Sequence, residues 1–436
     1  MTLETEFRAA IVADPHNDEP RLAYAQWLSD QKDPRGEFIR IQIELASSTS
    51  DETMQQKLMR RETTLLKKHG ETWNNEVPAW ARHQSPQFYR GFPEIRCEVS
   101  DWLRGASQLV TRIPLHRVNF KATTITLPRL AESVEMERVD LLDYSNNPLD
   151  DDSVSSFVAS SHLKNLTALY FWKCNLGASA AQAIAKSPHL KGLRKLQLEE
   201  NRITADGVAA LAQSPYLRNL SYLSLRNNHV GPDGGIALAG SSILNGLTVF
   251  SIGGNDFGPD ASVRFLRSLV SPLLSLYFEG NFMEDAGAEA LAAASPLKTL
   301  TALDVSYNRL TSHGIRALAK ARLLRNLVEL SAGANQLGTA GIQALAKSTV
   351  FSQLGSLHLD FADVGDDGAV AIASSKTLTR LTTLGLCDTQ IGNAGAEALA
   401  HAASLESLQS LSLFGNSFSN ESRSLLRKRF GKRVSL

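Results

Sequence analysis

The sequence predicts an α/β fold, a right-handed β–α solenoid bent into a horseshoe, with a small all-helical module ahead of it. Three observations predict this fold. An apolar pattern returns at a nearly fixed interval, each copy has a strand-like half and a helix-like half, and residues 1–46 lack the pattern. Repeats also explain how 436 residues can fold without one very large core, because each unit packs only on its neighbours.

The repeated pattern is L-x-x-L-x-L-x-x-N-x-I, with copies that begin at Leu193, Leu220 and Leu300. We call its asparagine position the marker. The marker falls at residues 147, 174, 201, 228, 255, 281, 308, 335, 362, 389 and 416. Every step is 27 residues except the step of 26 between Asn255 and Asn281, so chance is excluded.

Each unit has two halves. In the unit at 193–219 the segment LRKLQLEEN alternates apolar and polar residues, as a short strand does. The following segment is rich in Ala and Leu, and Val208, Leu211 and Ala212 share one face at helical spacing. Ser-Pro pairs at 187, 214 and 295 are expected to end helices. Strand and helix in alternation predict parallel strands on the inside and helices on the outside.

Two degenerate units are expected before the regular ones. The first contains Phe92, Ile95 and Cys97, and the second contains Leu115, Val118, Phe120 and Ile125.

The marker asparagines have a structural explanation, because a buried amide can satisfy backbone groups in the turns of adjacent coils. Cys174, Ala362 and Thr389 interrupt the series. Alanine cannot make these bonds, so we expect a local weakness or a bound water at residue 362.

This pattern resembles the ribonuclease-inhibitor-like class of leucine-rich repeats, and the resemblance covers residues 90–436. It implies a helical outer side and Asn or Cys at the marker. Members of the class are mostly protein-binding scaffolds, and some similar arrays act as GTPase-activating proteins or as substrate receptors.

Residues 1–46 form the expected helical module, in which Asp33 caps a third helix that begins at Pro34. The stretch DEPRLAYAQWLSDQKDPRGEFIRIQIEL is similar to the repeat-companion domain that precedes leucine-rich repeats in bacterial paralogue sets. That family has no established activity to carry over.

Three further segments complete the predicted organisation. Residues 47–90 form a helical connector and N-terminal cap, with a helix at 52–69 and aromatic residues at 71–93 that cover the open end of the solenoid. The repeats occupy residues 91–420. Residues 421–436 form a basic C-terminal cap, in which Leu425, Leu426 and Phe430 cover the last coil. The alternative role for its basic side chains is contact with nucleic acid or an acidic partner.

Composition narrows the function. Lys+Arg and Asp+Glu are both 45, so no global charge attracts nucleic acid or membrane. The sequence shows no signal peptide and no apolar run long enough for a spanning helix. Three scattered cysteines indicate a reducing compartment, with the cytoplasm as the expected location. No P-loop, GxGxxG after a strand or HExxH occurs, so we expect no enzyme, cofactor, metal or small-molecule substrate.

Binding residues are expected on the concave face, where two exposed strand columns begin at Asp143 and Ser145. Two clusters combine aromatic and charged residues, as interface hot spots do. The first contains Tyr170, Trp172, Lys173, Glu199, Glu200 and Arg226, and the second contains Tyr277, Glu279, Asp304 and Tyr307. For each cluster the alternative is ordinary surface variation. Between them, Gly253, Gly254, Gly333 and Gly385 are expected to leave shallow stretches for a bulky partner element.

One group raises the question of catalysis. His358, Asp360 and Cys387 fall on adjacent predicted strands, and such a set can support nucleophilic chemistry or a zinc site. The diagonal spacing is about 7 Å, and no oxyanion hole is evident. We therefore expect a binding scaffold for another protein. The alternatives are a regulator of a small GTPase acting through Arg226 and a substrate receptor that docks through residues 1–46.

Overall fold

The structure is a computed structural model that describes residues 2–15, 17–47 and 52–436. The chain divides into two compact units. The first unit is Met1–Asn175 with Ser187–Leu193, and the second is Leu176–Lys186 with Arg194–Leu436. No helix in the described part of the chain has the length and apolar character needed to cross a membrane.

The first unit opens with four helices, α1 Leu3–Ala13, α2 Asp18–Asp30, α3 Pro34–Ser47 and α4 Glu52–Asn74. As expected, Pro34 begins α3, and the Asp33 carboxylate accepts a hydrogen bond from the Arg35 amide at 2.8 Å. The fourth helix continues to Asn74, beyond the predicted end at residue 69.

A short hairpin of β1 Phe88–Tyr89 and β2 Phe92–Pro93 follows and is bound by α3. Arg35 donates to the Gly91 carbonyl from Nη2 at 3.0 Å, and Gln42 accepts from the Gly91 amide at 2.6 Å. A side chain at residue 91 would clash with Ile39, because a Cβ there would lie 2.2 Å from its Cγ1. The residues that resemble the companion domain therefore share their core with the hairpin.

The aromatic residues of 71–93 were expected to cover the end of the solenoid, which is only partly correct. Trp73 and Phe88 pack on Phe38 of α3 and so fill the core of the helical segment. Trp80 instead lies against Gly105 of the first repeat helix, α5 Val99–Leu109. Aromatic character alone did not show which of the two cores each ring would enter.

The strands of the first unit, β3 to β6, lie parallel and in register. They are β3 Ile95–Glu98, β4 Arg117–Lys121, β5 Leu141–Asp143 and β6 Ala168–Tyr170, with helices α6 Leu127–Leu130 and α7 Asp151–Val158. Strands β3 and β4 lie where the two degenerate repeats are predicted. The assignment of Ile125 to their core is wrong, because its side chain is 80% exposed in the turn before α6. Leu127, the first residue of α6, is buried in its place.

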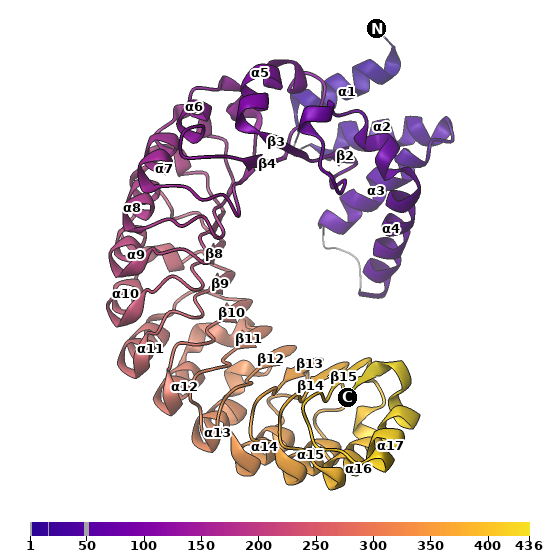
Figure 1. Ribbon diagram of the computed structural model, residues 1–436, viewed down its shortest axis with the longest axis vertical. Helices are drawn as coiled ribbons and strands as arrows, with labels where there is room; N and C mark the ends of the chain where they lie inside the picture. Colours follow the sequence, from indigo (N-terminus) through magenta and orange to yellow (C-terminus); the bar gives the residue numbers. More distant parts are fainter. Residues whose placement is uncertain (1, 16, 48–51) are drawn as a thin grey trace. The chain divides into compact units, whose positions relative to one another are not determined.

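The second unit repeats a strand, a turn and a helix (Figure 1). Its strands are β7 Lys195–Gln197, β8 Tyr222–Ser224, β9 Val249–Ser251, β10 Ser275–Tyr277, β11 Ala302–Asp304, β12 Glu329–Ser331, β13 Ser356–His358, β14 Thr383–Gly385, β15 Ser410–Ser412 and β16 Val434–Ser435. Its helices are α8 Ala178–Lys186, α9 Thr204–Ala212, α10 Gly231–Leu238, α11 Gly258–Ser268, α12 Glu284–Ala293, α13 Ser312–Lys320, α14 Gly338–Lys347, α15 Gly365–Ala373, α16 Asn393–His401 and α17 Asn420–Phe430. Within this unit the strands line the inner side of the bend and the helices form its outer side.

The C-terminal cap has one feature that was not predicted. After α17 the chain returns to the sheet, and β16 pairs in parallel with β15 through Val434 and Leu411. Leu426 and Phe430 of α17 are buried as expected, whereas Leu425 is only partly buried.

The marker asparagines link successive repeats. Asn308 is fully buried, and its Nδ2 donates to the carbonyl of Phe278, in the preceding repeat, at 2.8 Å. Its Oδ1 accepts from the amides of Asn281 and Met283 at 3.1 and 3.2 Å. The same bond to the preceding repeat is made by Asn228, Asn255, Asn281, Asn335 and Asn416. These bonds form a ladder along the second unit, as the amide chemistry predicted.

Ala362 interrupts this ladder. Its methyl group gives no acceptor for the amides of Asn335 and Leu337, which are the equivalents of the two amides that Asn308 satisfies. At the next marker, Thr389 donates to the Leu386 carbonyl of its own repeat. The Val364 amide donates a hydrogen bond to the Ala362 carbonyl at 2.9 Å.

A second ladder lies where the helices end, and the sequence interpretation missed it. The hydroxyls of Ser187, Ser214, Ser241, Ser348 and Ser375 each donate to a carbonyl of the preceding repeat. The Ser-Pro pairs were explained only as helix stops, although the recurrence of serine at this place carried the information.

Replacement of Asn308 by alanine removes the bonds that hold two repeats together. We expect Asn308→Ala to lower the free energy of unfolding by roughly 2–4 kcal/mol, since buried amides and carbonyls lose their partners. Chemical denaturation followed by circular dichroism measures this loss. Asn326→Ala is the matched control, because Asn326 is exposed and bonds only the Lys298 carbonyl. Equal losses in the two variants would contradict the account.

Restoration of the missing amide should have the opposite effect. We expect Ala362→Asn to raise the free energy of unfolding by about 1 kcal/mol, because two buried backbone amides gain an acceptor. The same denaturation experiment measures the change. A lower stability would show that residue 362 has no room for the amide, and that packing rather than hydrogen bonding determines the residue there.

Candidate functional site

On the inner face of the sheet, the side chains that point away from the core form three columns. The central residue of each strand, such as Leu303 or Leu330, is buried, so the residues on either side of it face outward. The two predicted columns lie at and beyond the ends of the strands. The column at the strand starts was overlooked, and it contains Lys195, Tyr222 and Glu329. The alternation used for the other columns could have found it.

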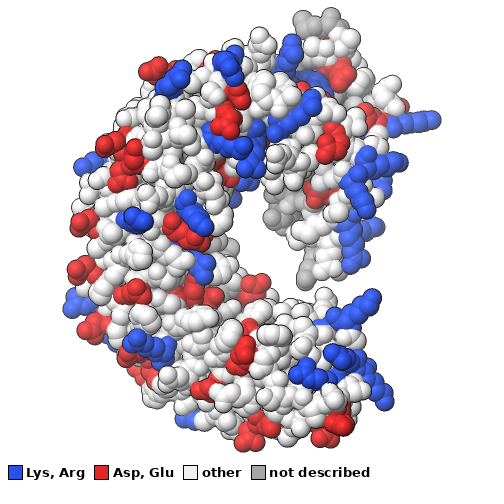
Figure 2. All heavy atoms as spheres, in the orientation of Figure 1, with Lys and Arg blue, Asp and Glu red and all other residues white. Residues whose placement is uncertain are grey.

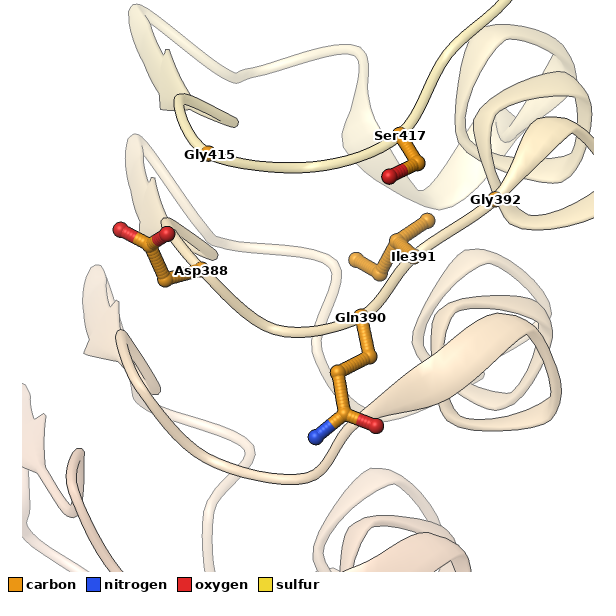
Figure 3. A pocket seen from close by; sticks show the side chains of 6 residues that line it. All are labelled: Asp388, Gln390, Ile391, Gly392, Gly415 and Ser417. Carbon is orange, nitrogen blue, oxygen red and sulfur yellow. The ribbon is translucent and has the colours of Figure 1, made fainter.

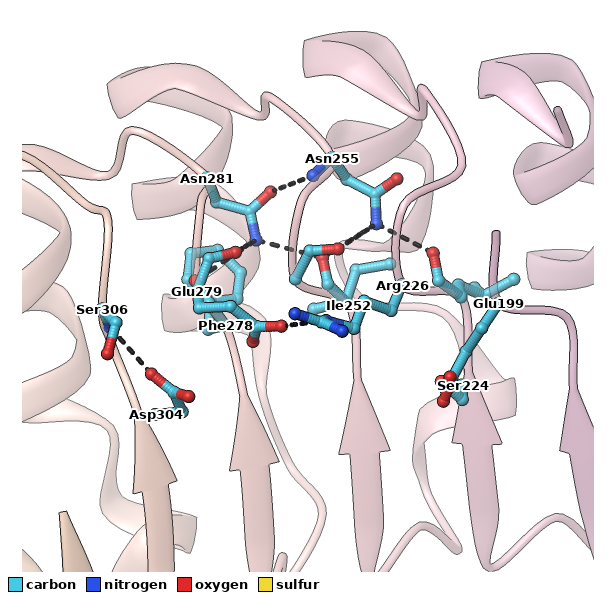
Figure 4. A network of polar contacts seen from close by, with 12 residues as sticks. Glu199, Ser224, Arg226, Ile252, Asn255, Phe278, Glu279, Asn281, Asp304 and Ser306 are labelled. Carbon is cyan, nitrogen blue, oxygen red and sulfur yellow. Dashed lines mark hydrogen bonds and ion pairs between the residues drawn. The ribbon is translucent and has the colours of Figure 1, made fainter. Parts of the chain in front are cut away.

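A polar network extends along successive repeats of the second unit (Figure 4). Arg226 forms an ion pair with Glu279, although a whole repeat lies between them. Gly253 makes this possible, because a Cβ there would lie 2.1 Å from the carboxylate carbon of Glu279. In the same network Ser224 donates to Glu199.

Burial raises the pKa of Glu279, and the nearby Asp304 carboxylate raises it further. Hydrogen bonding and the charge of Arg226 oppose this rise. Arg226 is thereby held along the face, with about half of its side chain exposed. The network is an ordered polar surface before any partner is present.

The second predicted cluster is brought together on neighbouring strands. Tyr277 of β10 lies in register with Asp304 of β11, whose carboxylate accepts from the Ser306 amide at 2.9 Å. Tyr307 follows β11 and is 58% exposed. Its backbone is left-handed, with φ of 56°. The equivalent left-handed position is glycine in three repeats, at Gly254, Gly280 and Gly415, and a residue with a side chain in the others, such as Phe361.

The glycines do not leave the expected shallow stretches. The Glu279 carboxylate covers Gly253, and the Asn227 side chain covers Gly254. Gly333 and Gly385 are both covered by Asp360, through its backbone carbonyl and its carboxylate respectively. Neighbouring repeats fill the space that a missing side chain leaves.

The first predicted cluster is divided between the two units. Tyr170, Trp172 and Lys173 belong to the first, whereas Glu199, Glu200 and Arg226 belong to the second. Trp172 is half-buried, and Lys173 and Glu200 are exposed at left-handed positions. That the two groups form one patch stays a prediction.

In the first unit Tyr170 belongs to a group centred on Arg117 of β4. The Arg117 guanidinium lies over the Tyr170 ring at 5.9 Å and forms ion pairs with Asp143 and, at 3.9 Å, with Glu94. Burial raises the pKa of Glu94, while the hydrogen bonds from Ser145 and Arg117 outweigh burial and lower the pKa of Asp143. The sequence interpretation missed Arg117 and Glu94, which precede the first regular repeat.

Beside that group, the ring of His116 stacks on Tyr89 with 3.6 Å between centroids. Its Nδ1 lies 3.1 Å from the Asp140 carboxylate. The sequence interpretation missed His116 as well, because it treated Tyr89 only as part of the N-terminal cap.

A cavity of about 340 Å³ opens between the last two regular turns of the second unit (Figure 3). It is lined by Asp388, Gln390, Ile391, Gly392, Gly415 and Ser417. Gln390 donates to Asp363 at 2.8 Å, and the exposed Phe414 precedes Gly415. The carboxylate of Asp388 and the amide of Gln390 lie at its edge, and the two glycines leave backbone exposed to it.

His358, Asp360 and Cys387 do lie together. The Asp360 carboxylate is 3.7 Å from His358 Nδ1 and accepts from the Cys387 amide at 2.8 Å. Burial and the Asp360 carboxylate raise the pKa of the Cys387 thiol to about 11. A reactive cysteine requires a lowered pKa, so this environment opposes formation of the nucleophile.

Comparison with known proteins gave a match to a family model and likenesses to solved structures, including the two below. The family model for the leucine-rich repeat matches residues 189–212, 216–239, 297–319 and 354–373. No curated protein matches the chain. Among solved structures, an internalin from Listeria monocytogenes is similar at 20% identity and a TM-score of 0.39, covering 70% of this chain and 82% of its own. The Rad7 and Elc1 complex of yeast is similar at 16% identity and a TM-score of 0.47. The match covers 89% of this chain and 98% of the matched chain. The four matched segments lie in the strand–helix units, so these units of the solenoid are leucine-rich repeats.

Proposed function

We propose that this chain is a scaffold that binds another protein on the inner strand face of its repeats. The observation that carries the proposal is Tyr307. A tyrosine in a left-handed turn costs about 1–2 kcal/mol of backbone strain, which glycine avoids at the same place in three other repeats. More than half of its surface is exposed, so burial offsets little of that cost. A role in contact with a partner accounts for a side chain that folding does not require.

The surroundings of Tyr307 support the same proposal. Tyr277 and Asp304 lie on the adjacent strands, and the Arg226–Glu279 pair is already ordered nearby. Aromatic side chains beside fixed charges are enriched where protein interfaces gain most of their binding free energy. Little ordering would then be needed on this side when a partner binds.

The finer assignments are part of the proposal. The 27-residue unit and its outer helices support the ribonuclease-inhibitor-like class, and the bonds of Arg35 and Gln42 give the companion-like residues a packing role. We assign no reaction and no cofactor. We place the protein in a reducing compartment, the cytoplasm, because Cys97, Cys174 and Cys387 are thiols.

No specific observation supports either alternative function. A GTPase regulator would need an arginine free to project, and Arg226 is held by Glu279. A docking module made of residues 1–46 would need to fold alone, yet Arg35 and Gln42 bond to Gly91.

The proposal is tested with Tyr277→Ala combined with Tyr307→Gly. Crosslinking in native lysate with quantitative mass spectrometry should show at least about a tenfold loss of the main partner, as expected for hot-spot residues. Thermal unfolding should change little, since glycine suits the left-handed turn. The control, Ile236→Ala with Val370→Ala, removes exposed apolar side chains from the outer helices α10 and α15.

Two results would overturn the proposal. One is unchanged capture by the folded double variant, and the other is an equal loss in the outer-face control. A parallel variant, Tyr170→Ala with Trp172→Ala, decides whether the first unit contributes. A selective loss there alone would place the contact in the first unit and not at Tyr307.

A further inference from the structure

A pocket in the first unit, separate from the proposed protein-binding face at Tyr307, holds arginine groups that no carboxylate neutralises. The cavity measures about 300 Å³. It lies between strands β3 and β4 and the segment 80–84, which meets β3 through an antiparallel bridge from Arg82 to Ile95. Its lining residues are Trp80, Arg82, Gln84, Arg96, Lys121 and the acidic pair Glu98 and Asp101, together with Cys97.

The charges in the pocket do not balance. Lys121 pairs with Glu98 at 3.5 Å, and Asp101 pairs with Arg104, which lies outside the lining. Arg82 donates to the backbone carbonyls of Val77 and Asn75 at 2.7 and 3.1 Å, which fixes the guanidinium but leaves its charge. Two positive charges, those of Arg82 and Arg96, therefore remain.

Arg96 is the more informative of the two. Across the described part of the chain it has no hydrogen-bond or ion-pair partner, and its Nε is buried without one. A buried donor without an acceptor costs about 1–3 kcal/mol, so such groups call for an explanation. Arg96 lies in register with Asn119 on the inner strand face, and Glu98 lies in register with Lys121.

One wall of the pocket is closely packed, and positive charge acts on a histidine near it. Trp80 forms a fixed wall, because its ring lies where a Cβ on Gly105 would be only 2.4 Å away. Burial lowers the pKa of the neighbouring His83, and the charges of Arg96 and Arg117 lower it further. Figure 2 shows Lys and Arg side chains gathered over the part of this unit that contains β3 and β4.

We propose that this pocket binds a phosphate group, with Arg96 and Arg82 as the guanidinium donors and Lys121 at the edge. A phosphate monoester carries a charge of about −1.5 to −2 at pH 7, which matches the two uncompensated arginines. Planar guanidinium groups are suited to phosphate oxygens, and such charge-assisted bonds are strong. The group comes from a phosphorylated side chain or from a free phosphate ion.

The experiment titrates the full-length protein by calorimetry at constant ionic strength. The probes are inorganic phosphate, the tripeptide Ala-phosphoserine-Ala and the same tripeptide without phosphate. Saturable binding of the phosphorylated tripeptide, or of inorganic phosphate, supports the site, and the tighter of the two identifies the source. The unphosphorylated tripeptide should not bind. Absence of saturable binding by both phosphate probes would overturn the proposal.

Three variants locate the binding. Arg96→Gln should weaken it at least about tenfold, as the loss of a charge-assisted bond predicts. Glu98→Gln, at an exposed residue, should strengthen it by releasing Lys121. Arg129→Gln, an exposed residue of α6 outside the pocket, makes the same change in net charge as Arg96→Gln and should leave binding unchanged.

The signs of these changes decide the outcome. Equal weakening by Arg129→Gln would show general electrostatic attraction and overturn the proposal. Weakening by Glu98→Gln would show that phosphate does not bind beside Lys121 and would overturn it as well. Because Arg96 is partly buried, circular dichroism should confirm that the Arg96→Gln variant is folded. The Glu98→Gln result does not depend on that control. As an independent readout, phosphate should raise the pKa of His83 in a proton NMR titration, and an unchanged His83 would contradict the site.

Discussion

The hydrogen bonds from marker asparagines to the backbone of the preceding repeat are the constraint on which the second unit depends. Each repeat is too small to bury its own apolar residues, so the array exists only if neighbours are held in register. The ladder does this within the core, where Asn228, Asn255 and Asn308 are completely buried and water cannot compete. The serine ladder at the helix ends adds a second line of bonds between the same neighbours.

This constraint has a consequence for the inner face. The residue before each marker is held in a left-handed turn, as at Glu200, Tyr307 and Asp388. The turn sets the direction in which each of these side chains leaves the backbone. The face therefore offers an ordered set of groups that extends from repeat to repeat, and the Arg226–Glu279 pair over Gly253 shows how neighbours complete it. A rigid surface of this kind suits protein binding, because little conformational entropy is lost on association.

Most of the fold could be predicted from the sequence, since the period and the alternation of apolar residues report the same strand–helix unit. The prediction weakened where the period changed. Ile125 was assigned to the core because it occupies an apolar position, but the shorter connection before α6 places Leu127 there instead. The site was less predictable. Arg117, His116 and Arg96 precede the regular repeats, and only the register of β3 and β4 shows which residues they face. The expectation of empty space at glycines was also wrong, because a side chain such as Glu279 of another repeat fills that space.

Hydrogen exchange of the full-length chain, resolved to single amides, tests the central claim most directly. The amides of Asn228, Asn281 and Leu310 each donate to the side-chain oxygen of a marker asparagine, so they should exchange slowly. The amides of Asn335 and Leu337, which face Ala362, should exchange distinctly faster within the same array. Equal protection at both sets of amides would contradict the account, since it would show that packing alone holds the repeats in register.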